Sequence, residues 1–207
     1  VIFMIYSING ERCTSSSRLL IQDTIREEFE AKLVERVNNI KVGHPLDPNT
    51  EIGPLIGDEH QNKVCSYFDI ARSDGANIRV GGNKIDGPGN YVQPTLFTGA
   101  TNNMRIAQEE VFGPVLVLIP FKDEADAIAI ANDSPYGLYA YVQTSDLNRA
   151  RRVARLMRAG GVSINGTSQD YMAPFGGYKQ SGNGREYGEF GVRDFLEIKS
   201  ISGFRTA

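Results

Sequence analysis

The sequence predicts an α/β protein with an open, mostly parallel sheet that has helices on both faces. Val115–Ile119 is apolar at every position, as strands are when both faces of a parallel sheet are covered. Helix, strand, helix and strand patterns follow it with short links, which is typical of right-handed βαβ units. The chain has 207 residues, of which 41 % are hydrophobic, so it is long enough to bury a core.

The first half of the chain alternates in the same way. Arg18–Gln22 is expected to form a strand and Thr24–Lys41 a helix, with a capping box at Thr24 and Glu27 and Gly43 at its end. A second helix is predicted over Asp58–Ser73, with its apolar residues on one side and Gly75 as its stop. The remaining expected elements are a strand at Asn77–Val80, a loop at 81–90, helices at Asp123–Asn132 and Asp146–Arg158, and strands at Leu138–Gln143 and Val162–Asn165.

The chain begins with an apolar stretch, Val1–Tyr6, where a natural terminus is usually polar and frayed. This favours the middle of a buried element, and therefore a piece of a longer polypeptide. The alternative is an N-terminal strand tucked into the core.

Composition excludes several functions. The net charge of -3 with interspersed basic residues makes nucleic acid an unexpected partner. No apolar run approaches the ~20 residues of a membrane span, and the opening stretch Val1–Tyr6 lacks the basic flank and small-residue cleavage site of a signal peptide. We therefore expect a cytoplasmic protein that does not bind membranes.

The two cysteines differ in their surroundings. Cys65 lies within a predicted helix, where a free cysteine is usually a small hydrophobe. Cys13 lies in a polar loop between Arg12 and Arg18, whose charges would favour the nucleophilic thiolate. Cys13 is therefore the candidate nucleophile.

Neither histidine fits a Cys-His dyad by spacing, and isolated histidines such as His44 and His60 are more often surface residues. Two cysteines and two histidines without paired spacing also make a metal site improbable. A base for Cys13 is therefore expected to be a carboxylate.

Two further motifs are candidates for binding. Glu109-Glu110-Val111-Phe112-Gly113-Pro114 leads into the buried strand, and its Gly-Pro turn would hold a carboxylate and an aromatic ring that can grip a ribose and its base. The glycine-rich stretch 174–186 implies close backbone approach or positive φ. Gly182-x-Gly184-x-x-x-Gly188 resembles a dinucleotide fingerprint in spacing only, because it does not join a predicted strand to a helix.

Taken together, Asn9-Gly10-Glu11-Arg12-Cys13-Thr14, the 109–114 motif and Pro174-Phe175-Gly176-Gly177-Tyr178-Lys179 resemble signatures of the C-terminal half of the NAD(P)-dependent aldehyde dehydrogenase superfamily. Gly53-Pro54-Leu55-Ile56 and Asn132-x-x-x-Tyr136-Gly137-Leu138 lie between them in matching order. The resemblance covers essentially the whole chain.

The resemblance implies a role for each matching residue. Cys13 matches the catalytic cysteine, which attacks an aldehyde to give a thiohemiacetal and then, after hydride transfer to NAD or NADP, a thioester that water hydrolyses. Its backbone N–H would supply half of an oxyanion hole. Glu110 matches the acid that binds the nicotinamide ribose, Phe112 the aromatic beside it, and Lys63 lies near a further cofactor-binding residue. The residues expected to line the substrate tunnel are Asn165, Ser168, Gln169, Asp170 and Tyr171.

One departure and one similarity bear on the substrate. The residue after Gly10 is commonly Gln in the superfamily and is Glu11 here. Glu11-Arg12-Cys13, with Gly43-x-Pro45-Leu46-Asp47-Pro48, is similar to the hydroxymuconate-type semialdehyde dehydrogenases, whereas 173–199 is similar to general bacterial aldehyde dehydrogenases.

The resemblance also implies a domain plan. Residues 1–194 would be the catalytic α/β domain, and 195–207 an oligomerisation strand that pairs across subunits of a dimer or tetramer. The cofactor-binding domain, the general-base glutamate and an oxyanion-hole asparagine would precede Val1, so we expect the chain alone to be inactive. Two alternatives stay open: a CoA-acylating aldehyde dehydrogenase, and a non-catalytic association module in which Cys13 is a relic.

Overall fold

The computed structural model describes residues 1–166 and 170–203, and these divide into two compact units. The first comprises residues 1–134 with 155–157, and the second comprises 135–154 and the described residues from 158 onward. Each unit is considered by itself. Among the described residues, no helix is long and apolar enough to cross a membrane.

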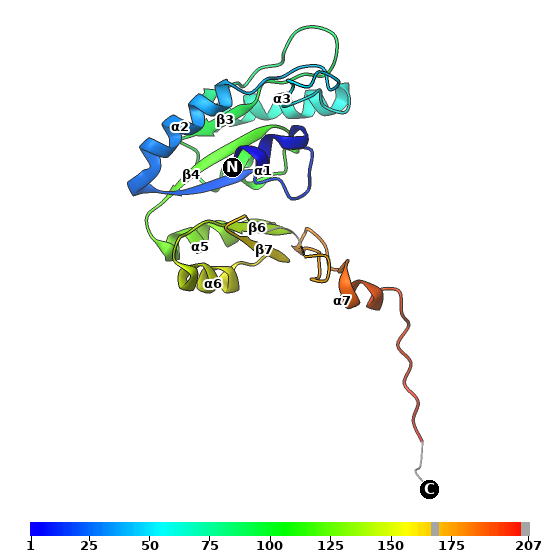
Figure 1. Ribbon diagram of the computed structural model, residues 1–207. Helices are drawn as coiled ribbons and strands as arrows, with labels where there is room; N and C mark the ends of the chain where they lie inside the picture. Colours follow the sequence, from blue (N-terminus) through cyan, green and yellow to red (C-terminus); the bar gives the residue numbers. More distant parts are fainter. Residues whose placement is uncertain (167–169, 204–207) are drawn as a thin grey trace. The chain divides into compact units, whose positions relative to one another are not determined.

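The first unit is built on a four-stranded sheet with the order β1-β4-β3-β2 (Figure 1). β1 (Arg18–Gln22) and β3 (Thr95–Thr98) both pair in parallel with the central β4 (Val115–Phe121), and β2 (Asn77–Val80) pairs antiparallel with β3. The expectation of a mostly parallel sheet is confirmed. β3 was not foreseen, because its four residues between Pro94 and Gly99 are too few to show a period.

Each face of this sheet packs on its own set of helices. Side chains alternate along β4, so that Leu116 and Leu118 join one core while Val115, Val117 and Ile119 join the other. The first core contains the apolar faces of α1 (Ile2–Tyr6) and α2 (Arg26–Asn38), and the second contains that of α3 (Asp58–Ser73). Coverage on both sides explains the continuous apolar run that predicted this strand.

The helix boundaries test the sequence signals. α3 has the predicted bounds, and Gly75 follows it with φ +92°, a left-handed residue typical of a helix end. The predicted helix over Thr24–Lys41 was too long at both ends. Asp23–Ile25 forms a 3-10 turn and Ile25 occupies the N-cap without a side-chain bond, so the capping box does not form. The helix ends at Asn38, well before Gly43.

The first unit also contains α4 (Arg105–Gln108) and α5 (Glu124–Asn132). Asp123 caps α5 by accepting a 2.9 Å hydrogen bond from the backbone N–H of Asp126, which confirms a helix start at this aspartate. The apolar start of the chain forms α1 and not a strand, and its Ile5 and Tyr6 are buried.

The second unit contains two small sheets. β6 (Tyr139–Val142) and β7 (Gly161–Ile164) pair in parallel across α6 (Leu147–Leu156), as a βαβ unit requires. β5 (Tyr136–Gly137) pairs antiparallel with β8 (Tyr178–Lys179). The expectation that β4, β6 and β7 share one sheet is not met in the described residues, because β1 and β3 already occupy both edges of β4.

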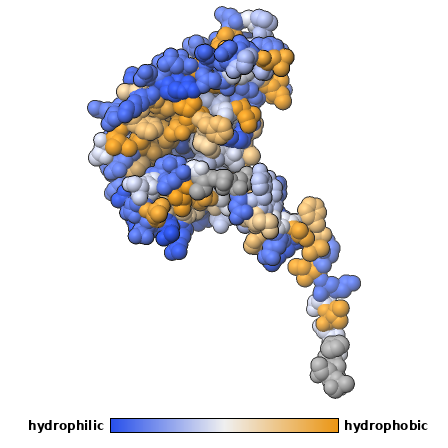
Figure 2. All heavy atoms as spheres, viewed as in Figure 1, coloured by the Kyte–Doolittle hydropathy of each residue, from blue (hydrophilic) through white to orange (hydrophobic). Residues whose placement is uncertain are grey.

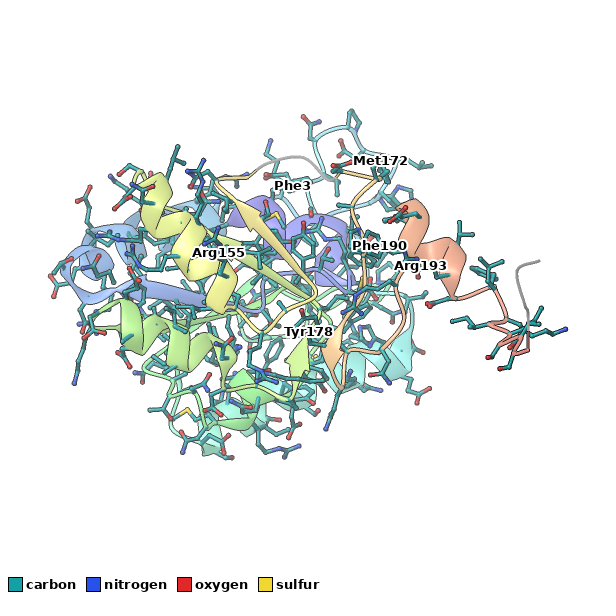
Figure 3. All side chains as sticks on the ribbon, turned by 90° about the horizontal axis from the view of Figure 1, so that it is seen from below. Phe3, Arg155, Met172, Tyr178, Phe190 and Arg193 are labelled. Atoms are coloured by element: carbon teal, nitrogen blue, oxygen red, sulfur yellow. The ribbon has the colours of Figure 1, made fainter. Side chains whose placement is uncertain are left out.

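The last helix among the described residues of the second unit is α7 (Gly188–Arg193), on which the guanidinium of Arg193 lies 5.6 Å from the ring centroid of Phe190 (Figure 3). Residues 195–203 are assigned no strand, so the expected terminal strand is not formed within the described chain. Their apolar side chains are exposed, Ile198 to 99 %, and Figure 2 shows them interspersed with hydrophilic ones. A strand needs a neighbouring edge with which to form hydrogen bonds.

Candidate active site

The loop that carries Cys13 is shaped by three successive left-handed residues: Ile8, Asn9 and Gly10 have φ values of 52°, 57° and 71°. Ahead of it, the hydroxyl of buried Tyr6 donates a 3.0 Å hydrogen bond to the carbonyl of Thr95. Burial raises the pKa of Tyr6, so it remains a neutral donor. The loop is therefore anchored to the sheet just before it reaches Cys13, whose side chain is exposed.

We call residues 9–13 the nucleophile loop and residues 109–114 the Phe112 turn, and the two are in direct contact. A Cβ atom at Gly10 would lie 2.1 Å from the carbonyl oxygen of Gly113. Gly113 in turn faces α3, where its own Cβ would lie 2.9 Å from a methyl of Val64. Glycine is required at both positions because backbone packs against its neighbour with no room for a side chain.

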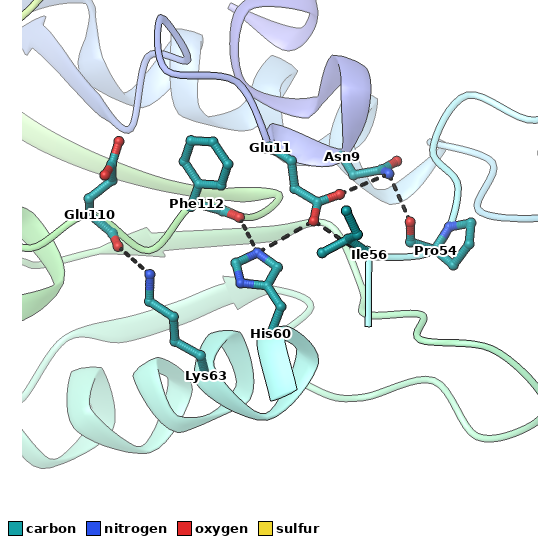
Figure 4. Close-up of polar contacts among 8 residues, drawn as sticks. All are labelled: Asn9, Glu11, Pro54, Ile56, His60, Lys63, Glu110 and Phe112. Atoms are coloured by element: carbon teal, nitrogen blue, oxygen red, sulfur yellow. Dashed lines mark hydrogen bonds and ion pairs between the residues drawn. The ribbon is translucent and has the colours of Figure 1, made fainter. Parts of the chain in front are cut away.

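Helix α3 holds the Phe112 turn with residues spaced three and four apart (Figure 4). Lys63 Nζ donates to the carbonyl of Glu110 at 3.1 Å, and Nε2 of His60 lies 2.7 Å from the carbonyl of Phe112. One turn further on, the hydroxyl of Tyr67 donates to the carboxylate of Glu109 at 2.9 Å. All three lie on the same face of the helix, as this spacing dictates.

These contacts bring the three predicted cofactor-binding residues together. Glu110 is exposed, and its carbonyl is bound by Lys63 while its side chain projects from the turn (Figure 4). Phe112 is half-buried and has φ +63°, an unusual conformation for a bulky residue. A carboxylate, an aromatic ring and an ammonium group are thereby grouped beside the nucleophile loop.

His60 is the residue whose part in this site was not foreseen from the sequence. It was expected to be a surface residue, but only 17 % of its side chain is exposed, and Nε2 lies 3.5 Å from Oε1 of Glu11 as well as against the carbonyl of Phe112. The sequence did offer one signal: His60 lies three residues before Lys63 near the start of a predicted helix, a spacing that places two side chains on the same helix face. Its partner, the Phe112 carbonyl, is a backbone atom and leaves no trace in sequence.

The polar loop around Gly53–Ile56 is tied to the nucleophile loop by two side chains. The amide of Asn9 accepts from the Gly53 N–H at 2.8 Å and donates to the Pro54 carbonyl at 2.9 Å. The carboxylate of Glu11 accepts from the Ile56 N–H at 3.1 Å. Two motifs that are 45 residues apart in sequence therefore form one structure.

The two arginines beside Cys13 contact other groups. Arg12 donates to the Met4 carbonyl at 2.9 Å and lies over the ring of Phe3. Arg18 donates to Asn102 and to the carbonyls of Ile130 and Ala131, and burial lowers its pKa, an effect that nearby Asp133 partly offsets. Sequence proximity to Cys13 predicted a thiolate-stabilising role that these contacts do not support.

Glu109, next to the candidate ribose acid, has a different set of partners. Arg105 binds it through two nitrogens at 2.7 and 3.0 Å, and this contact is the main cause of a lowered pKa for Glu109, with the Tyr67 bond second. The pair of adjacent acids is thus divided: Glu109 is held by α3 and α4, while the Glu110 side chain projects from the turn.

The candidate substrate residues belong to the second unit. Asn165 forms hydrogen bonds at 2.9 Å with both the N–H and the carbonyl of Thr144, and Asp170 accepts from the Met172 N–H. The ring of Tyr171 lies edge-on to Tyr187, with centroids 5.4 Å apart. Ser168 and Gln169 lie outside the described residues.

Cys65 behaves as the sequence predicted. It lies on α3, partly buried against the core, and desolvation is the largest cause of a raised pKa for its thiol. A raised pKa disfavours the thiolate, and this fits a packing residue better than a nucleophile.

The chain thus combines a mostly parallel α/β fold with an exposed cysteine on a loop that contacts the Phe112 turn. The model of the aldehyde dehydrogenase family matches residues 1–201. The chain belongs to the aldehyde dehydrogenase family.

Named relatives and solved structures agree with this family assignment. The chain is 44 % identical over 198 residues to a 3-succinoylsemialdehyde-pyridine dehydrogenase from Pseudomonas sp., covering 94 % of this chain and 42 % of that protein. It is 46 % identical to the crystal structure of HpcC from Thermus thermophilus, with a TM-score of 0.91 and coverage of 99 % and 43 %. It is 38 % identical to the NAD+ complex of an aldehyde dehydrogenase from Bacillus cereus, with a TM-score of 0.93 and coverage of 97 % and 41 %. The chain spans about two fifths of the length of these relatives.

Proposed function

We propose that this chain is the catalytic part of an NAD(P)-dependent aldehyde dehydrogenase, with Cys13 as its nucleophile. The observation that carries the proposal is the backbone contact between Gly10 and Gly113, because it joins the loop of the exposed Cys13 to the turn that carries Glu110 and Phe112. Family membership and a relative whose solved structure is an NAD+ complex support it.

The residues of the Phe112 turn suit a dinucleotide. The carboxylate of Glu110 can accept hydrogen bonds from ribose hydroxyls, Phe112 offers an apolar face to the nicotinamide end, and Lys63 supplies positive charge. When bound, the dinucleotide supplies a hydride acceptor. The chain's own part is to bind and orient it, and we assign that part to these three residues.

The remaining chemistry belongs to Cys13. Its thiolate adds to the aldehyde carbon, and the oxygen takes the negative charge of a thiohemiacetal, toward which the Cys13 backbone N–H can donate. Loss of hydride from that carbon leaves a thioester, and addition of water then releases the carboxylic acid and restores the thiol. We assign activation of the water to a carboxylate base outside residues 1–207.

Substrate and assembly follow from the same proposal. Asn165 and the 168–172 loop are assigned to the wall of the substrate tunnel, and the Pseudomonas relative supports a semialdehyde. The exposed apolar residues of 195–203 support pairing with a second copy in a homo-oligomer. Both cysteines are free thiols, which suits the reducing cytoplasm.

The test compares the 207-residue chain with the full-length polypeptide for NAD(P)H formation from short aldehydes and semialdehydes. We expect turnover without CoA from the full-length protein, none from the chain alone, and a loss of at least about 10³-fold in Cys13→Ala. Cys65→Ala is the matched control and should retain activity. Turnover that requires CoA would replace the proposal with an acylating enzyme, and full activity in Cys13→Ala would make that cysteine a relic.

A further inference from the structure

The inference begins with the acid that departs from the family's usual glutamine. Three donors converge on the carboxylate of Glu11: the Ile56 N–H at 3.1 Å, the Asn9 amide at 3.3 Å and Nε2 of His60 at 3.5 Å. Only 14 % of its side chain is exposed. A carboxylate is acceptor-only and can satisfy all three, whereas a glutamine would direct an NH₂ group at another donor.

The state of His60 follows from its partners. Nε2 faces the Phe112 carbonyl at 2.7 Å and the Glu11 carboxylate at 3.5 Å, and both are acceptors, so Nε2 must carry a hydrogen. Nε2 therefore donates its hydrogen mainly to the closer Phe112 carbonyl. The more distant carboxylate of Glu11 adds electrostatic attraction to the same N–H group. His60 thus links a residue two positions before Cys13 to a residue two positions after Glu110 (Figure 4).

The carbonyl that His60 binds belongs to a strained residue. Phe112 is held at φ +63°, which is costly for a bulky side chain and persists only where neighbours fix it. Gly113 beside it packs on α3 and on Gly10, so a shift at Phe112 would move both the Glu110 side and the nucleophile loop. The hydrogen bond from Nε2 of His60 holds this peptide group at its carbonyl oxygen.

We propose that Glu11 and His60 form a positioning pair that fixes the Phe112 turn relative to the nucleophile loop. The inference deepens the proposed function, because the pair would set the dinucleotide site against Cys13. Neither residue touches the reacting atoms in this role. His60 acts through Phe112, and Glu11 acts through His60.

Hydrogen exchange on the 207-residue chain tests the coupling without any catalysis. We expect His60→Leu to speed exchange about tenfold in both 9–13 and 109–114, since the hydrogen bond to the Phe112 carbonyl is lost, while β4 serves as the internal reference for global unfolding. His60→Gln keeps an amide donor and should restore protection to within about threefold. His44→Leu is the matched control, because Nδ1 of His44 accepts a hydrogen bond from the Leu46 N–H within its own exposed turn, outside both segments.

Glu11→Gln tests the pair from its other side and remains informative if His60→Leu fails to fold. It should speed exchange in 109–114, which Glu11 does not itself contact by a hydrogen bond. The double variant Glu11→Gln with His60→Gln should recover protection, because the carbonyl of one glutamine can accept from the amide of the other. A change in exchange rate that is confined to the mutated segment would overturn the proposal. So would a double variant whose loss of protection equals the sum of the losses in the two single variants.

Kinetics of the full-length protein add a readout that simple destabilisation would not give. We expect His60→Leu to raise the KM for the dinucleotide about tenfold with kcat within about threefold, and His60→Gln to reverse the change. An unchanged KM in a folded His60→Leu protein would refute the positioning role. A wild-type protein that reduces no dinucleotide would refute the proposed function instead, and the exchange experiment would still decide the pair.

Discussion

The two units of this chain hold their candidate site residues in different ways. In the first, the sheet is buried on both faces, and the nucleophile loop and Phe112 turn are fixed by backbone contacts and by side chains of α3. In the second, the strands β6 and β7 are mostly half-buried. There Asn165 is held by hydrogen bonds to Thr144, and Tyr171 by an edge-on ring contact with Tyr187. Under the proposed function, the part of the site that needs fixed geometry belongs to the first unit, and the part assigned to substrate binding belongs to the second.

The largest expected effect is on the free energy of unfolding, at a glycine of the first unit, and a glycine of the second unit provides the comparison. Gly10→Ala would place Cβ 2.1 Å from the Gly113 carbonyl, so the nucleophile loop and the Phe112 turn must separate; we expect a loss exceeding about 4 kcal/mol. Gly166 also has positive φ, at +75°, but no heavy atom of the described residues beyond its chain neighbours lies within 4 Å of a Cβ built there, so for Gly166→Ala we expect only backbone strain of about 1 kcal/mol. Urea unfolding followed by circular dichroism measures both, and equal losses would contradict the contrast between the units.

A smaller effect concerns the acid next to Glu110. The pKa of Glu109 is lowered in the folded state, chiefly by Arg105, so its stabilisation is present above the carboxyl's ordinary pKa and is lost as pH falls through the folded value. Arg105→Met should raise the pKa of Glu109 toward its ordinary value, as measured by NMR titration of the carboxyl group. The pKa of Glu28, which Lys32 lowers on α2, should not change and serves as the control. A pKa of Glu109 that does not change in Arg105→Met would mean that Tyr67, and not Arg105, lowers it.

Much of the first unit could be predicted because its signals are local. The period of α3 and the apolar run of β4 follow directly from burial on one side or on both. The capping box at Thr24 failed because a 3-10 turn displaced the start of α2, and β3 was missed because four buried residues carry no period. The sheet of the second unit was misjudged because occupancy of the edges of β4 depends on partners that are distant in sequence.

The site divides in the same way. Motif residues such as Cys13, Glu110 and Phe112 could be singled out by type and spacing, and the structure groups the latter two with Lys63. His60 could not, because its partner is the backbone carbonyl of Phe112 and its neighbour Glu11 lies 49 positions away. The roles suggested for Arg12 and Arg18 relied on nearness in sequence, and three-dimensional contacts assign them to other carbonyls.

The most direct measurement is the site of the covalent intermediate. Full-length protein is mixed with an aldehyde and dinucleotide, quenched in acid, digested and analysed by mass spectrometry. We expect a peptide acylated at Cys13, and no acylated peptide from Cys13→Ala. Cys65, with its raised thiol pKa, should remain unmodified. Acylation at Cys65, or turnover without any label at Cys13, would contradict the assignment of the nucleophile.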